Sequence, residues 1–224
     1  MELPLILVNL KCYSQGTGRN ALKLAKLCSD VAKKHKVNIA VSPQFTDICK
    51  ILNKVRIPVF AQHIDSVGTG AHTGHVTAFA VKEAGAVGTL INHSERKLAR
   101  REIDKCVEMA RKNDLISVVC SDTLMKSKDI AIMRPDFIAY EPPELIGTGV
   151  SVSKTKPRVV GDIVKMIKRV NPRIKVLCGA GITNGEDVKR ALELGTEGAL
   201  VASGVVKADN PRNVLIEFAE ATKF

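Results

Sequence analysis

The sequence predicts an α/β protein that folds as one (β/α)8 barrel over residues 1–224. Short runs rich in Val, Ile and Leu recur without polar alternation, as strands buried on both faces of a parallel sheet require. Segments with helical periodicity separate these runs, and no Ser/Gly linker divides the chain. A chain of 224 residues with 45% hydrophobic side chains can bury one full core, although length alone also permits two small domains.

Eight apolar runs are predicted to be strands, and they alternate with helices along the whole chain. Eight strand and helix units of this length favour a closed barrel over an open doubly wound sheet. In order, the predicted strands are Leu5–Val8, Asn38–Val41, Pro58–Ala61, Ala86–Ile91, Ile116–Cys120, Asp136–Tyr140, Ile174–Cys178 and Glu197–Val201.

The predicted helices have clear faces and ends. After the first strand, Ala21, Leu24, Ala25, Leu27, Cys28, Val31 and Ala32 gather on one apolar stripe. Lys23, Lys26, Lys33 and Lys34 recur at helical spacing and predict a solvated face. Asn184 is a candidate N-cap. Gly85 and Gly195 are candidates for the left-handed residue that ends a helix.

The charge balance favours anionic partners. With 34 Lys and Arg against 23 Asp and Glu, the net charge is +11, which attracts phosphorylated metabolites and nucleic acid alike. Two Tyr, six Phe and no Trp are too few for a base-stacking surface, so we expect no nucleic-acid partner. Binding of polyanions by a catalytically idle barrel remains an alternative, which high salt would abolish.

Cysteine usage and hydropathy predict a cytoplasmic protein with no membrane partner. The six cysteines form no CxxC pair and are interpreted as reduced, mostly buried thiols. The apolar opening Leu3–Leu10 is short and lacks a basic leader, so it is not read as a signal peptide. Every apolar run falls short of the roughly 18 residues that a membrane span needs.

Three polar positions follow predicted strands, at the barrel end where chemistry is expected. After the first strand, alternation points Asn9 and Lys11 to the same side. After the fourth, His93 is expected where the next helix begins, so that helix-start amides keep its ring neutral. After the sixth, burial of Glu141 should raise its affinity for a proton. A solvated lysine and an ordinary first-turn histidine beside a capping Ser94 are the alternatives.

Two kinds of loop complete this predicted site. Small residues follow the seventh and eighth strands, Gly179–Gly181 and Ala202–Gly204, where backbone N–H groups can approach a phosphate. Pro and Gly flank a short segment after Glu141 that reads as a hinged lid, or otherwise as an ordinary loop. The predicted lid comprises Pro142, Pro143, Glu144, Leu145, Ile146, Gly147, Thr148 and Gly149.

The motifs NLK, INHSER, EPPELIGTG, CGAGI and VASG, in this order, resemble triosephosphate isomerase over nearly the whole chain. The short chain and the absence of Trp resemble the archaeal branch of that family, which is typically tetrameric, so a homotetramer is expected over a dimer. The resemblance implies interconversion of dihydroxyacetone phosphate and D-glyceraldehyde 3-phosphate, in glycolysis and gluconeogenesis. Other phosphate-binding barrels, such as phosphoribosylanthranilate isomerase or indole-glycerol-phosphate synthase, would share only the last two loops.

The resemblance also implies roles for single residues. Glu141 would be the general base and neutral His93 the hydrogen-bond donor to the enediolate. Lys11, oriented by Glu95, would stabilise negative charge, and Asn9 would help hold the substrate. No metal or organic cofactor is expected, because proton transfer needs only an acid and a base. Backbone N–H groups near Ile146, Gly181, Ala202 and Ser203 would hold the phosphate.

The third predicted loop resembles the family's subunit-contacting loop. By that resemblance Thr73 should reach the neighbouring subunit's active site. His63, His72 and His75 in the same stretch also suggest a metal site, but HxxH in a loop is weak evidence for one.

Overall fold

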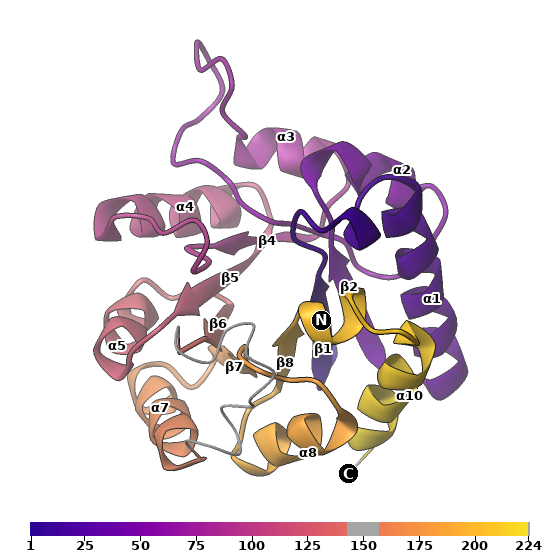
Figure 1. The fold of residues 1–224 in the computed structure, drawn as a ribbon. Helices are drawn as coiled ribbons and strands as arrows, with labels where there is room; N and C mark the ends of the chain where they lie inside the picture. The colour runs from indigo at the N-terminus through magenta and orange to yellow at the C-terminus, as the bar shows by residue number, and fades with distance from the viewer. Residues whose placement is uncertain (143–156, 224) are drawn as a thin grey trace.

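The computed structural model describes residues 1–142 and 157–223. The strands of this part form one sheet of eight in the order β2-β1-β8-β7-β6-β5-β4-β3, and every strand pair is parallel. A parallel bridge between Val41 and Val59 links the two ends of that order. The sheet therefore curls into a (β/α)8 barrel with helices around it, as predicted (Figure 1).

All eight predicted strands are present, and their bounds differ from the prediction by two residues at most. β3 and β4 start later than predicted, for reasons local to each. The Pro58 nitrogen has no hydrogen to donate to a ladder, and Ala86 N–H still bonds back to Val81 O (3.2 Å) at a helix end. The strands are β1 Leu5–Asn9, β2 Asn38–Ser42, β3 Phe60–Ala61, β4 Gly88–Ile91, β5 Ile116–Ser121, β6 Phe137–Tyr140, β7 Lys175–Cys178 and β8 Gly198–Val201.

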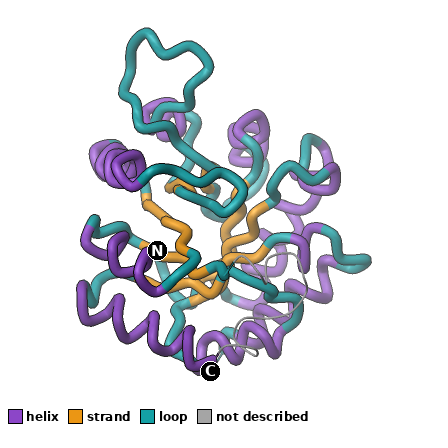
Figure 2. The backbone as a smooth tube through the Cα atoms, turned by 60° about the vertical axis from the view of Figure 1, so that its left-hand side comes forward, coloured by secondary structure: helices purple, strands orange, loops and turns teal. Residues whose placement is uncertain are grey.

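Helices follow the strands and form the outer layer of the barrel (Figure 2). The first of them confirms the predicted pattern: Ala21, Leu24 and Ala25 are buried, whereas Lys23 and Lys26 are exposed. The helices are α1 Arg19–His35, α2 Ile48–Leu52, α3 Ala78–Glu83, α4 Arg100–Lys112, α5 Leu124–Ile132, α7 Pro157–Val170, α8 Gly185–Glu193, α9 Ser203–Val206 and α10 Pro211–Ala221, with 3-10 turns η1 Ser14–Gly16 and η2 Phe45–Asp47.

The predicted helix ends are also observed. Asn184 caps α8, with its side chain accepting from Asp187 N–H at 3.0 Å. Gly85 and Gly195 follow α3 and α8 with φ of +90° and +91°, a conformation that side chains with a Cβ rarely adopt. Local sequence signals therefore decide where these helices begin and end.

Alternation along β1 divides its side chains between two apolar cores. Leu5 and Leu7 point into the barrel, where they join Phe60, Leu90 and Leu177. Ile6 and Val8 belong to the larger core between the barrel and its helices. Both sets are fully buried, which explains why β1 reads as a continuous apolar run. The interior of the barrel is a filled core, so it leaves no channel for a ligand.

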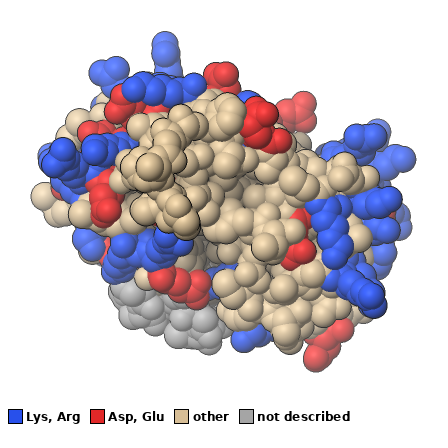
Figure 3. Space-filling model, turned by 90° about the horizontal axis from the view of Figure 1, so that it is seen from above, with Lys and Arg blue, Asp and Glu red and all other residues tan. Residues whose placement is uncertain are grey.

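The connection between β3 and α3 projects from the barrel as a long loop (Figures 1 and 2). Residues 68–75 are all exposed, and residues 66–81 contain no Lys, Arg, Asp or Glu. On the side of the molecule that carries this loop and α3, Figure 3 shows a broad uncharged area bordered by charged side chains.

The cysteines are free thiols in the structure, four of them buried and two, Cys12 and Cys49, exposed. Burial raises the pKa of Cys28, Cys106 and Cys178 to about 12, so these thiols stay protonated. Within residues 1–142 and 157–223, every helix is too short or too polar to cross a bilayer.

Candidate active site

The carboxyl end of β1 places Asn9 and Lys11 at the barrel rim. The Asn9 side-chain oxygen accepts from Lys11 N–H (3.0 Å), and the Lys11 ammonium donates to Glu95 Oε1 (2.9 Å). The strand ends at Asn9, and Lys11 adopts φ of +48° in the turn beyond it. Both residues line the same cavity, as expected for side chains on one side, but the turn at Lys11 and not strand alternation brings them together.

Gln62 fixes the strained backbone at Lys11. Its amide nitrogen donates to two carbonyl oxygens, those of Lys11 and Ser42, at 3.0 Å each. A lysine with positive φ costs on the order of 1 kcal/mol or more and persists only where neighbours hold it. Gln62, which directly follows β3, thus joins the turn after β1 to the end of β2.

His93 lies at the rim after β4, but the prediction that it begins a helix is wrong. α4 starts at Arg100, and His93 instead opens a turn in which its carbonyl accepts from Arg96 N–H (2.8 Å). Glu95 N–H donates to His93 Nδ1 at 3.2 Å, closer than the Glu95 carboxylate, whose Oε2 is 3.6 Å from the same nitrogen. Since a backbone N–H can only donate, Nδ1 must accept and the ring proton lies on Nε2.

Glu141 directly follows β6, and its carboxylate faces His93. The distance between Glu141 Oε1 and His93 Nε2 is 3.5 Å, and the glutamate side chain is 5% exposed. Burial raises the pKa of the Glu141 carboxyl, and the opposing influences of His93, a Cys120 hydrogen bond and Lys11 offset it only in part. A carboxylate with raised proton affinity beside an N–H donor is suited to general acid–base chemistry.

Cys120, on β5, lies against this carboxylate from inside the barrel. Burial, together with the nearby Glu141, raises the pKa of its thiol well above the ordinary value. The thiol therefore stays protonated beside the carboxylate.

The loops after β7 and β8 form the opposite wall of the cavity. Gly181, Ala202 and Ser203 line it together with Asn9, Lys11, His93 and Glu141. These loops need glycine because they pack closely: a Cβ at Gly204 would lie 2.7 Å from Ile182 O, and one at Gly179 would lie 2.5 Å from Glu141 Cγ. Ser203 begins α9, in which the N–H groups of Val205 and Val206 donate to Ala202 O (3.0 and 2.9 Å), so Ser203 and Gly204 N–H lie at the open start of the helix.

Of the predicted lid, Pro142 is described and buried. Pro143, Glu144, Leu145, Ile146, Gly147, Thr148 and Gly149 lie outside the described residues, so the structure does not test the lid or the phosphate role of Ile146.

The three histidines of the suggested metal site do not converge. His63 is buried and bonds Asp65 Oδ1 (3.0 Å), whereas His72 and His75 are exposed on the projecting loop with their rings 5.8 Å apart. Within the described part of the chain, His, Cys, Asp and Glu form no group of three that could hold a metal.

Comparison with known proteins agrees with this geometry. The family model for triosephosphate isomerase matches residues 4–222. The chain belongs to the triosephosphate isomerase family. It is 49% identical to the triosephosphate isomerase of Methanosarcina barkeri, with 96% of this chain and 97% of that protein covered. It is 51% identical to that of Methanothermus fervidus (97% and 98% covered) and 50% identical to that of Methanobacterium bryantii (96% and 96%). These relatives are archaeal, as the short chain and the absence of Trp indicated.

Three residues that shape the site of this triosephosphate isomerase family member were not predicted from the sequence. Gln62 holds Lys11, and Cys120 contacts Glu141. Asn92 adopts φ of +59°, donates to Cys120 O (2.9 Å) and accepts from Leu98 N–H (2.9 Å), which fixes the loop carrying His93. Only Asn92, next to the histidine and of a type that tolerates positive φ, had a recognisable signal.

Proposed function

We propose that this protein interconverts dihydroxyacetone phosphate and D-glyceraldehyde 3-phosphate. The observation that carries the proposal is the pair formed by Glu141 and His93, 3.5 Å apart at the rim, with Lys11 lining the same cavity. A base, a neutral N–H donor and a cation around one cavity are the groups that proton transfer next to a carbonyl requires.

In the proposed reaction, the Glu141 carboxylate removes a proton from the carbon next to the carbonyl of the triose. His93 Nε2–H donates to the oxygens of the resulting enediolate, and the Lys11 ammonium stabilises the negative charge. Glu141 then returns the proton to the adjacent carbon, so that carbonyl and hydroxyl exchange places and no redox partner or cofactor is consumed. Glu95 orients Lys11, and Asn9 helps to hold the substrate. These roles follow a known pattern for this family.

The substrate's phosphate would lie against the loops after β7 and β8. Gly181 has φ of +69°, and the small residues Ala202 and Ser203 let backbone N–H groups approach an anion. We assign Ile146 to the same cradle from its place in the motif that resembles the family's lid. Binding energy from the phosphate would be used to close that lid over the enediolate.

We further propose that the protein works as a homo-oligomer, with a tetramer favoured over a dimer, in cytoplasmic glycolysis and gluconeogenesis. The uncharged loop of residues 66–77, which projects from the barrel with Thr73 exposed, supports a contact between subunits. The buried, protonated thiols suit a reducing compartment.

Replacing the proposed base tests the function. Glu141→Gln keeps the shape of the side chain but removes the proton acceptor, so we expect kcat to fall by at least about a thousandfold in a coupled assay of triose phosphate interconversion. Glu83→Gln, on the exposed face of α3, should retain wild-type activity. Full activity of Glu141→Gln, or an inactive wild-type protein, would refute the proposal.

A titration with 2-phosphoglycolate tests complementarity to the enediolate. The analogue carries both a phosphate and a carboxylate that resembles the enediolate, so it should raise Tm more than inorganic phosphate does at equal concentration. An equal rise with both ligands would mean that the cavity recognises phosphate alone.

A further inference from the structure

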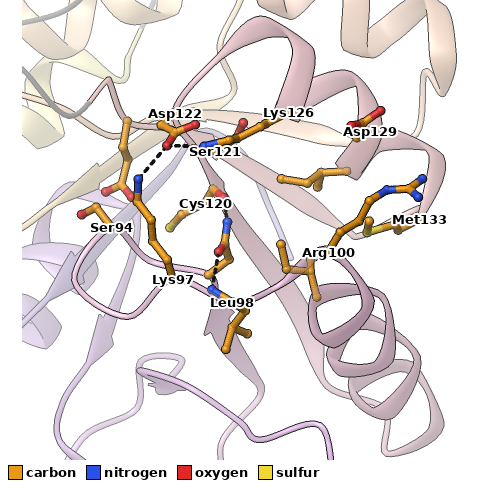
Figure 4. Close-up of a pocket in the computed structure, with 14 residues that line it drawn as sticks. Ser94, Lys97, Leu98, Arg100, Cys120, Ser121, Asp122, Lys126, Asp129 and Met133 are labelled. Carbon is orange, nitrogen blue, oxygen red and sulfur yellow. Dashed lines mark hydrogen bonds and ion pairs between the residues drawn. The ribbon is translucent and has the colours of Figure 1, made fainter.

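A second cavity lies on the other side of Glu141, outside the barrel rim. It is found between the loop that joins β4 to α4 and helix α5, and it has a volume of about 150 Å³. Figure 4 shows its walls, with Ser94 and Lys97 on one side and Lys126 and Met133 on the other. Glu141 and Cys120 also line it, and because Glu141 lines the substrate cavity too, one carboxylate borders both cavities.

One side of this cavity is apolar. Leu98, Ile103, Ile130 and Met133 line it, and Ile103 and Ile130 are 6% and 2% exposed. A cavity of about 150 Å³ with such walls accommodates a molecule of the size of benzene. The apolar side therefore fits a compact hydrocarbon group.

The cavity also offers hydrogen-bond acceptors. Glu141 Oε2, Asp122 Oδ1 and Ser94 Oγ are buried and have no hydrogen-bond partner in the described part of the chain. The Glu141 side chain is 95% buried, and an unpaired polar atom at such a position costs about 1–3 kcal/mol. A ligand with a hydroxyl donor at one end would satisfy an oxygen that has no partner among residues 1–142 and 157–223.

The charges around the cavity cancel. Asp122 bridges Lys97 and Lys126, with 2.9 Å to each ammonium. Counting Arg100, three cations line the cavity, and three carboxylates, those of Asp122, Asp129 and Glu141, balance them. An ionic ligand would therefore gain little from the net charge and would lose its hydration, which favours a neutral molecule.

We propose that this cavity binds a neutral hydroxyl compound about the size of phenol, with its O–H donating to Glu141 Oε2 and its apolar body against Leu98 and Ile130. Such a ligand would hold the Glu141 carboxylate and so inhibit the enzyme without entering the substrate cavity. The inhibition rests on the proposed isomerase function, whereas the binding does not.

The probe is phenol itself, titrated into isotope-labelled wild-type protein and followed by amide NMR shifts. We expect saturable shifts at Ser94, Cys120 and Ile130, and little change at Gly181 and Ser203 in the substrate cavity. Leu98→Phe and, separately, Met133→Phe fill the cavity and should weaken binding by at least about tenfold. Leu124→Phe, on the same helix as Ile130 but outside the cavity, should bind like wild type.

Melting temperatures identify any variant that fails to fold. If one of the two cavity-filling variants fails, the other tests whether filling the cavity weakens phenol binding. Saturable shifts centred on Gly181 and Ser203, no saturable shifts, or unchanged binding in both filling variants would overturn the proposal. In the activity assay, phenol should lower kcat of the wild type and of Leu124→Phe more than that of Leu98→Phe. If the wild type lacks isomerase activity, the proposed function fails, but the NMR titration still decides whether the cavity binds.

Discussion

At the residue scale, folding stability and catalysis place opposite requirements on the Glu141 carboxyl. The residue is 4% exposed, and one of its carboxyl oxygens has no partner in the described residues. Burial disfavours the ionised form that a general base must adopt, and this is why its pKa is raised. Residues of this kind are retained for function at a cost in folding free energy.

The raised pKa predicts a pH dependence with a definite sign. The folded state holds the Glu141 proton more tightly than the unfolded state, in which the pKa of the carboxyl is near 4.5. The stability that this group contributes is therefore complete below pH 4.5 and is lost as pH rises through the folded pKa. Activity needs the ionised base, so kcat/KM should rise over the same interval. We expect its acidic inflection above 4.5 in a pH–rate profile.

The Glu141→Gln variant separates these two effects. Its melting temperature at pH 7 should equal or exceed that of the wild type, while the difference disappears near pH 4. A lower melting temperature of the variant at pH 7 would mean that the carboxylate stabilises the fold, contrary to the burial argument.

At the element scale, the loops after β7 and β8 depend on close packing between glycines and backbone. A Cβ at position 204 would stand 2.7 Å from Ile182 O and 3.1 Å from Thr183 Cα. Neither neighbour is the free end of a side chain, so one loop has to move. The proposed phosphate cradle is therefore fixed by the distance between two elements that are remote in sequence.

Gly204→Ala should therefore raise KM for the triose phosphates by at least about tenfold, a loss of about 1.4 kcal/mol in binding. Steady-state kinetics measure this effect. Gly161→Ala is the matched control, because a Cβ there meets open space on α7. It should leave KM unchanged and stabilise the helix by about 0.5–1 kcal/mol. Equal KM values in both variants would show that the cradle tolerates the shift.

At the scale of the whole molecule, the long loop after β3 is the feature that the barrel itself does not explain. Residues 68–75 are exposed and make few contacts with their own chain beyond turns such as that from His72 to His75. An exposed, uncharged projection is typical of a segment that a partner covers. Its base is held firmly, since Asp65 Oδ2 accepts from Val76 N–H at 2.7 Å.

Analytical ultracentrifugation should accordingly give a mass of about four chains of 24.2 kDa. Thr73→Arg places a cation on the uncharged loop and should reduce that mass, with a parallel loss of activity if the loop supports a neighbouring site. Lys26→Ala, on the solvated face of α1, should change neither. A monomer in the wild type would refute the proposed oligomer.

The sequence alone determined the barrel and the positions of its chemistry. Apolar runs such as Leu5–Val8 are buried on both faces and so carry a strong local signal, which is why every strand was predicted. Glu141, Asn9 and the small residues of the last two loops were found because they directly follow such strands. His93 was correctly placed at the rim, but the helix assigned to it starts seven residues later, at Arg100.

Only the tertiary structure decided how these residues are held. A hydrogen bond from the backbone N–H two residues away orients the ring of His93. A hydrogen bond from Gln62, 51 residues away, holds the backbone turn at Lys11. The second cavity behind Glu141 likewise depends on the spacing between the β4–α4 loop and α5. Contacts of this kind join side chains that leave no periodic pattern along the chain. Burial follows local periodicity and can be read from sequence, whereas the partners of a polar group depend on which loops the closed barrel brings together.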